Sequence, residues 1–182
     1  MPDCNKNLWA PWRMEYIRSL ASETDDSTCF LCRYWNEPQN DAENFVVRRY
    51  QDTFIVMNRF PYTNGHLLVA LAAHKPELTD LDDSELIQMT KTLRDGVALL
   101  RQVTGAQGFN IGYNIGRCAG AGLPGHLHAH IVPRWSGDTN FMAVIGDTRV
   151  ISESLQSLHA QLTTAATSRC AGSKSLETEE PQ

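Results

Sequence analysis

The sequence predicts an α+β fold, in which an antiparallel sheet of about five strands is covered by one long helix and a C-terminal helix. Short segments rich in β-branched and aromatic residues follow one another along the chain, separated by turn residues. One long helical pattern lies among these segments, which is typical of an antiparallel sheet covered on one face. The length of 182 residues fits one compact domain.

Five segments have the composition of strands. They are residues 45–48, 53–57, 66–71, 109–115 and 127–132. The first two flank the polar residues 50–52, as in a hairpin, and the third follows a turn at 61–65. Residues 141–145 are a candidate for a sixth strand.

The long helix is predicted over residues 83–104. Asp82 is a good N-cap with Glu85 three residues later, and Gly105 supplies a left-handed stop. An apolar stripe at 3.6-residue spacing predicts the face that packs on the sheet. It consists of Leu86, Met89, Leu93, Val97 and Leu100.

A second helix is predicted over residues 152–167, where leucines recur at 155, 158 and 162. The following segment, 170–182, is polar and acidic and predicts a disordered tail.

The composition excludes several classes of protein. A net charge of −5 argues against a protein that coats nucleic acid, which would usually be basic. No apolar run is long enough to span a membrane, and the first residues lack the apolar segment of a signal peptide. Five cysteines are too few for a disulfide-stapled scaffold, so we expect a reducing, cytoplasmic location and metal or redox chemistry at paired cysteines.

Three of the six histidines fall within five residues, at His126, His128 and His130. In a strand, side chains two positions apart point to the same face, so the three rings would face one way. The Cβ atoms of His126 and His130 would then be about 13 Å apart at about 3.3 Å per residue. That distance argues against one zinc ion shared by all three rings. The pattern therefore favours nucleophilic catalysis by at least one of them.

This segment, HLHAHIV, resembles the histidine triad family of nucleotide hydrolases and transferases. The similarity also takes in VMNRFPYTNGHLLV, GFNIGYNIGRCAG and VPRWSGDTNF, and covers about residues 45–150. The opening LWAPWR and the PRWSGDTNF segment are most similar to the branch of bacterial diadenosine tetraphosphate phosphorylases or adenylyltransferases. The resemblance implies three parts: an aromatic arm with a zinc knuckle (1–44), a nucleotide-binding catalytic domain (45–169) and the tail (170–182).

The family chemistry breaks a phosphoanhydride or phosphoramidate at the α-phosphorus of a nucleotide. The resemblance makes His128 the nucleophile, which forms a nucleotidyl-imidazole intermediate while a backbone carbonyl holds its other ring nitrogen. It gives His130 the role of binding phosphate or the leaving oxygen. The glycine-rich segment 119–125 could offer backbone N–H groups to the phosphate.

Further substrate-binding positions follow from the same resemblance. Asn58 would hold the ribose hydroxyls, His66 would lie near ribose and base, and Asn114 near the α-phosphate. By themselves, Asn58 would be an ordinary turn residue and His66 an ordinary surface residue. Ala121 and Gly122 stand where the phosphorylase branch has Gly-Ser, so the missing hydroxyl leaves water or phosphate open as the second-step acceptor.

Cys29 and Cys32 form a C-x-x-C pair, whose spacing is compatible with zinc, redox chemistry or chance. A thioredoxin-like site would need a βαβ unit next, whereas residues 33–44 are predicted to be loop. Relatives in the family complete such a pair with two histidines, here His74 and His126. A Cys₂His₂ set is a closed, structural Zn²⁺ site. Cys4, Cys118, Cys170 and His159 are expected to be ordinary residues, with His159 on the surface.

The leading hypothesis is an enzyme that cleaves adenine dinucleoside polyphosphates, such as diadenosine tetraphosphate, at the α-phosphate. Alternatives are a nucleoside phosphoramidate or aminoacyl-adenylate hydrolase, a nucleotide-binding regulatory module with incidental turnover, and a zinc-dependent redox protein. The expected partner is an adenine nucleotide, and neither nucleic acid nor a membrane is expected.

A homodimer is also expected, as in other histidine triad proteins. Trp9, Trp12 and Tyr16 need burial that a small domain does not readily supply. Leu99 lies beside the main stripe of the long helix and would widen its apolar face toward a second subunit.

Overall fold

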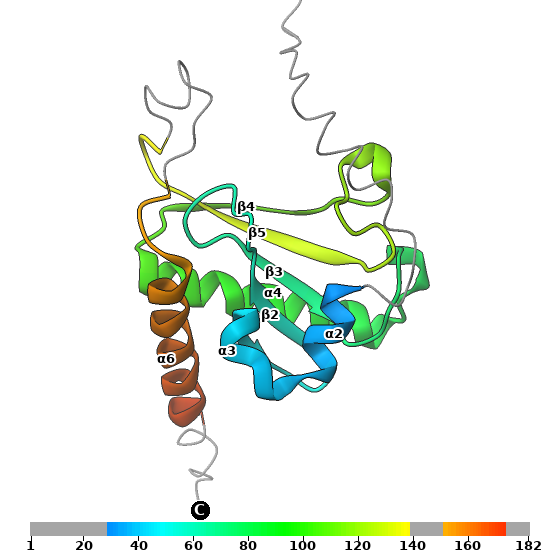
Figure 1. Cartoon of the computed structure of the whole chain (residues 1–182), viewed down its shortest axis with the longest axis horizontal. Helices are drawn as coiled ribbons and strands as arrows, with labels where there is room; N and C mark the ends of the chain where they lie inside the picture. The colour runs from blue at the N-terminus through cyan, green and yellow to red at the C-terminus, as the bar shows by residue number, and fades with distance from the viewer. Residues whose placement is uncertain (1–28, 139–150, 174–182) are drawn as a thin grey trace, which may run out of the picture.

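The computed structural model describes residues 29–138 and 151–173, and these form one five-stranded antiparallel sheet with helices on both faces (Figure 1). Along the sheet the order is β1-β2-β3-β5-β4. The strands are β1 (Val46–Arg49), β2 (Thr53–Met57), β3 (Leu67–Leu71), β4 (Gly108–Tyr113) and β5 (His128–Arg134). This architecture confirms the predicted α+β class and the predicted number of strands.

The helices are α2 (Phe30–Asn36), α3 (Asp41–Asn44), α4 (Asp83–Thr104) and α6 (Leu155–Ser173). Short 3₁₀ segments lie at Pro38–Asn40, Leu78–Asp80 and Arg117–Ala119. None of the helices in these two ranges is long and apolar enough to cross a membrane.

Strand ends differ from the sequence prediction by one or two residues, because pairing partners decide where a strand stops. β5 continues to Arg134, which pairs with Gly108, and it begins at His128, which pairs with Ala70. His126 therefore lies just before the strand rather than within it.

The sheet separates two apolar clusters. On one face α4 packs against β2, β3 and β5, and α6 packs against α4 and β1. On the other face Leu31 and Tyr34 of α2 pack with Phe54 and Leu68. Strand residues alternate between these clusters, as the period of two requires.

The predicted ends of α4 are confirmed. The Asp82 carboxylate accepts the Glu85 N–H at 2.9 Å, and the Glu85 carboxylate accepts the Asp82 N–H at 2.9 Å. Gly105 ends the helix with φ 63°. The capping box and left-handed glycine are local signals, so the sequence carries them fully.

The face that α4 buries is rotated from the predicted stripe. Leu86 is 37% exposed, whereas Leu99 is completely buried within this chain's own core. The helix approaches the sheet closely at Gly96, where an added Cβ would lie 2.6 Å from Ile131 Cδ1. The buried face is centred on this small residue, so Leu99 is not available to a second subunit.

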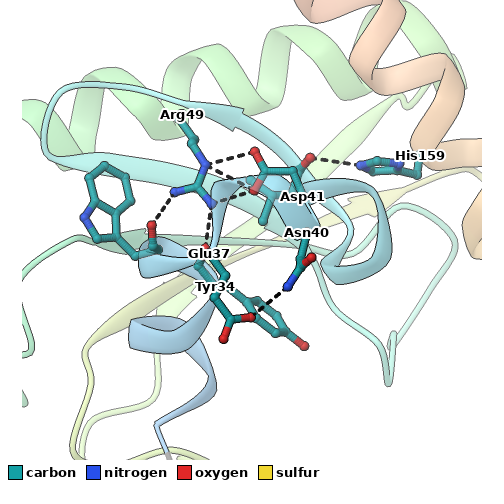
Figure 2. A network of polar contacts seen from close by, with 8 residues as sticks. Tyr34, Glu37, Asn40, Asp41, Arg49 and His159 are labelled. Carbon is teal, nitrogen blue, oxygen red and sulfur yellow. Dashed lines mark hydrogen bonds and ion pairs between the residues drawn. The ribbon is translucent and has the colours of Figure 1, made fainter.

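Residues 33–44 are mostly helical rather than the predicted loop, and Arg49 of β1 anchors them (Figure 2). Its guanidinium donates to the carbonyl oxygens of Tyr34 at 2.5 Å and Trp35 at 2.8 Å, and to the Asp41 carboxylate at 2.9 Å. A cation at the last carbonyls of a helix satisfies orphan acceptors and complements the helix dipole. These contacts attach α2, which carries Cys32, to the sheet.

α6 begins at Leu155 and continues to Ser173, past the predicted start of the tail at 170. His159 of this helix is half-buried rather than on the open surface. Its Nε2 lies 2.9 Å from the Val46 carbonyl oxygen (Figure 2). Its ring also meets the Phe45 ring edge-on. The predicted aromatic arm, the candidate strand 141–145, Cys4 and residues 174–182 lie outside the described residues.

Candidate active site and metal centre

Four side chains, all of them predicted metal ligands, meet beside α2. Ligand atoms of Cys29, Cys32, His74 and His126 all lie within 4.8 Å of one another. His126 Nδ1 is 3.3 Å from Cys29 Sγ and 3.4 Å from Cys32 Sγ, and His74 Nδ1 is 3.1 Å from Cys32 Sγ. A tetrahedral zinc ion with ordinary bond lengths separates sulfur and nitrogen ligands by about 3.5 Å. The cluster therefore has the donor set and the spacing that a metal ion needs.

Secondary structure places these ligands. Cys29 is the N-cap of α2 and Cys32 lies in its first turn, while His74 follows β3 and His126 precedes β5. His126 Nε2 lies 3.0 Å from the Leu71 carbonyl oxygen, so this nitrogen carries the proton and Nδ1 faces the thiols. Such an outer hydrogen bond orients a metal-binding histidine.

The backbone of His126 also orients the next histidine of the triad. Its carbonyl oxygen lies 2.8 Å from His128 Nδ1. A carbonyl can only accept, so Nδ1 of His128 carries the proton and Nε2 keeps an unshared electron pair. Burial lowers the pKa of His128, with an opposing contribution from this hydrogen bond. The ring is therefore held neutral in one tautomer, as a nucleophile requires.

His130 lies beside His128 on β5, with ring centroids 5.1 Å apart. Burial, and secondarily the neighbouring His128, lowers the pKa of His130 to about 4. Its Nδ1 is 2.9 Å from His66 Nε2, and its Nε2 is 3.5 Å from Asn114 Nδ2. Asn58 Nδ2 is in turn 3.2 Å from His66 Nδ1. The sheet thus brings four of the predicted substrate-binding residues into one connected group.

The glycine-rich approach to β5 is a tight turn. Gly116 and Gly120 have φ of 74° and 86°, which favour glycine. The amide of Ala121 donates to the Gly116 carbonyl at 3.3 Å, so it serves the loop itself. Ala121 is buried and Gly122 is partly exposed.

Sequence reasoning missed one residue of this group, Tyr62. Its main-chain N–H donates to His66 Nδ1 at 3.2 Å. The centroid of its ring lies 4.5 Å from that of His66, with the two planes tilted by 39°, and 6.0 Å from that of His130, with the two planes nearly parallel at 15°. A tyrosine inside a predicted turn gives no signal by periodicity, because its role depends on where the turn folds back.

Comparisons with known proteins find relatives over most of the chain. A model of the HIT domain matches residues 39–137. The chain is 36% identical over 162 residues to a protein of Mycobacterium tuberculosis named AP-4-A phosphorylase, covering 87% of this chain and 83% of that protein. It is 37% identical over 82 residues to a bis(5'-nucleosyl)-tetraphosphatase [asymmetrical] of Schizosaccharomyces pombe, covering 45% of this chain and 44% of that protein.

Among solved structures, a Zn-bound histidine triad family protein from Mycobacterium smegmatis aligns with a TM-score of 0.65 at 23% identity. The alignment covers 81% of this chain and 99% of that protein. At this identity the likeness establishes the shared fold.

Proposed function

Because the chain belongs to the HIT domain family, we propose that it is an enzyme that cleaves adenine dinucleoside polyphosphates at an α-phosphorus through a nucleotidyl-histidine intermediate on His128. The observation that carries this proposal is the 2.8 Å contact between His128 Nδ1 and the His126 carbonyl, which leaves Nε2 unprotonated. The names of the two relatives given above support diadenosine tetraphosphate as the substrate to test.

In the first step, Nε2 of His128 forms a bond to the α-phosphorus, and the bond from phosphorus to the bridging oxygen breaks. The leaving group from diadenosine tetraphosphate is ATP. His130, which lies beside His128, and Asn114, which lies beside His130, are proposed to bind the oxygens on which negative charge increases. Asn58 and His66 are proposed to hold the nucleoside.

In the second step, an acceptor oxygen attacks phosphorus and the phosphorus–nitrogen bond breaks, which restores His128. Water as the acceptor gives AMP, and inorganic phosphate gives ADP. Gly122 offers no hydroxyl where the phosphorylase branch has serine, so the acceptor must be identified by its product.

We propose that Cys29, Cys32, His74 and His126 hold Zn²⁺ as a structural ion. Four protein ligands fill a tetrahedral site and leave no position for substrate. A reducing cytoplasm is the proposed location, since both cysteines must stay as thiolates.

Product analysis tests the function. The protein is incubated with diadenosine tetraphosphate, with and without inorganic phosphate, and the nucleotides are separated. Cleavage to ATP plus AMP, or to ATP plus ADP only when phosphate is added, supports the proposal and names the acceptor. Tight nucleotide binding without turnover would instead indicate a binding module, and turnover of phosphoramidates alone would favour that hydrolase class.

A further inference from the structure

The histidine pair His66–His130 raises a question that the proposed reaction leaves open, namely where the single proton of each neutral ring lies. A neutral imidazole has one N–H and one acceptor nitrogen, so each ring can serve a phosphate oxygen only in one of its two tautomers. Burial lowers the pKa of His130 to about 4, so near pH 7 its ring is neutral. Hydrogen bonds therefore decide the position of its proton.

Nδ1 of His66 is surrounded by donors. The main-chain N–H of Tyr62 lies 3.2 Å away, and a backbone amide can only donate. Asn58 Nδ2 lies 3.2 Å away as well, and the orientation of this amide is supported because Phe60 N–H donates to its Oδ1 at 2.9 Å. Nδ1 of His66 must therefore be the acceptor, and the proton of the ring lies on Nε2.

The tautomer of His130 follows from that of His66. His66 Nε2–H points at His130 Nδ1, 2.9 Å away, which must then accept. The proton of His130 is left on Nε2. Asn114 Nδ2 lies 3.5 Å from this nitrogen, and because an amide nitrogen can only donate, the Asn114 amide must turn its Oδ1 toward the Nε2–H in this tautomer. In this tautomer His130 offers a donor for a phosphate or leaving-group oxygen, whereas the other tautomer would present a lone pair and repel it.

The turn that carries Tyr62 is held in place by several contacts. Asn58 N–H donates to the His66 carbonyl at 2.9 Å, and the Thr63 hydroxyl donates to the Pro133 carbonyl at 3.2 Å. Gly65 supplies a left-handed φ of 79° where the chain enters β3. The amide is thus presented by a fixed backbone rather than by a side chain that can rotate.

We propose that Tyr62 is a positioning residue of the site: its main-chain N–H, acting through His66, holds the proton of His130 on Nε2. Tyr62 as a whole residue is 41% exposed, and its ring, stacked at 15° to the plane of His130, covers the pair against water. The catalytic consequence rests on the function proposed above, whereas the tautomers do not.

The test reads the tautomers directly, by ¹⁵N NMR of imidazole-labelled full-length protein near pH 7 without substrate. We expect His66 and His130 each to show the proton on Nε2, with Nδ1 in the far-downfield position of an unprotonated nitrogen. Nδ1-protonated His130 in the unmodified protein would overturn the proposal, and this spectrum decides the matter even where a variant does not fold.

Three variants isolate the main-chain N–H. The single variant Asn58→Ala removes the side-chain donor to His66. The double variant Asn58→Ala/Tyr62→Ala keeps the main-chain N–H of residue 62 but loses the tyrosine ring. The double variant Asn58→Ala/Tyr62→Pro also removes that N–H. We expect both rings to stay Nε2-protonated in the first two proteins and the Nδ1-protonated form of His130 to appear only in the third. His128, held by the His126 carbonyl, is the internal control and should keep its proton on Nδ1 throughout. An unchanged His130 in the proline variant would contradict the proposal.

Kinetics provide the second readout. With diadenosine tetraphosphate, Asn58→Ala/Tyr62→Pro should lose about tenfold or more in kcat relative to Asn58→Ala/Tyr62→Ala, with a smaller change in KM, because a donor to the transition state is lost. Equal kcat values would contradict the catalytic consequence. Absence of turnover in the unmodified protein would count against the proposed function, and the tautomer assignment would stand or fall separately.

Discussion

His128 is the side chain on which the proposed reaction depends. Its surroundings hold the ring in the neutral tautomer that a nucleophile requires. His128→Ala should lower the rate of cleavage by at least about 10³-fold, which is about 4 kcal/mol at 1.4 kcal/mol per tenfold change, while nucleotide affinity stays within a few-fold. Mass spectrometry of a quenched reaction should find an adenylylated peptide containing His128. Cys118→Ser is the matched control and should keep the adduct, because Cys118 is exposed and lies outside the group around His130. An adduct on His130 or Cys118 would refute the assignment.

The lowered pKa of His130 also makes the stability of the folded protein depend on pH. Burial lowers its pKa from 6.5 to about 4, so below pH 6.5 the unfolded chain binds a proton that the folded chain resists. The stabilisation that comes from this neutral ring is fully present above pH 6.5 and is lost as the pH falls from 6.5 toward 4. We expect urea unfolding midpoints to fall less between pH 7.5 and 5 in His130→Gln than in the unmodified protein. Equal losses would show that His130 does not titrate in this way.

At the scale of elements, α4 packs closely against β5 at Gly96. Gly96→Ala gains helix propensity of about 1 kcal/mol, but its Cβ would lie 2.6 Å from Ile131 Cδ1 in a fully buried site, where overpacking costs about 1–3 kcal/mol. We expect a net loss of about 1 kcal/mol in the free energy of unfolding. Ile131→Val removes the clashing methyl, so the double variant should be more stable than the sum of the two single changes predicts. Simple additivity in denaturant unfolding would mean that the clash is relieved elsewhere.

We predict that helix α2 is stabilised by the metal ion proposed at Cys29 and Cys32. Cys29→Ser or Cys32→Ser should lower the thermal midpoint more than it lowers activity per folded molecule, because a closed site stabilises structure. Elemental analysis should find about one zinc ion per chain in the unmodified protein and a loss of zinc in both variants. The exposed Cys118→Ser should retain both zinc and thermal midpoint. Protein prepared without chelators that contains no zinc would remove this site.

Among residues 29–138 and 151–173, β4 is an edge strand of the sheet, and we predict that the whole molecule assembles as a homodimer there. The middle of β4 is exposed, with Ile111 49% exposed, and an edge of this kind is a ready surface for pairing. Sedimentation equilibrium at micromolar concentration should give about twice the chain mass of 20.4 kDa. Ile111→Lys should shift the mass toward one chain, and a single-chain mass at every concentration in the unmodified protein would exclude the dimer. Leu99 lends this prediction no support, because it is buried in its own core.

Features that depend on neighbours in sequence were predictable. The capping box between Asp82 and Glu85 and the helix end at Gly105 depend on residues close in sequence. The same holds for the two-residue alternation that gives the sheet its two faces. The contact between the His126 carbonyl and the His128 ring also joins near neighbours, but only the family resemblance implied a backbone carbonyl there, and the structure identified it as that of His126. The family resemblance added His74 and the nucleotide-binding positions, which no spacing in this chain reveals.

Tertiary structure decided which face of each periodic element is buried and which distant groups meet. Periodicity predicts an apolar stripe on α4, but the sheet selects the face on which Gly96 permits close approach, and so Leu99 is buried and Leu86 is exposed. Strand order places Cys29 beside His126, 97 residues later in the chain. The contact of the Tyr62 amide with His66 arises from the path of a turn, and every residue except proline carries such an amide. Side-chain identity alone therefore gives no signal for it, and only the folded backbone brings it to the histidine pair.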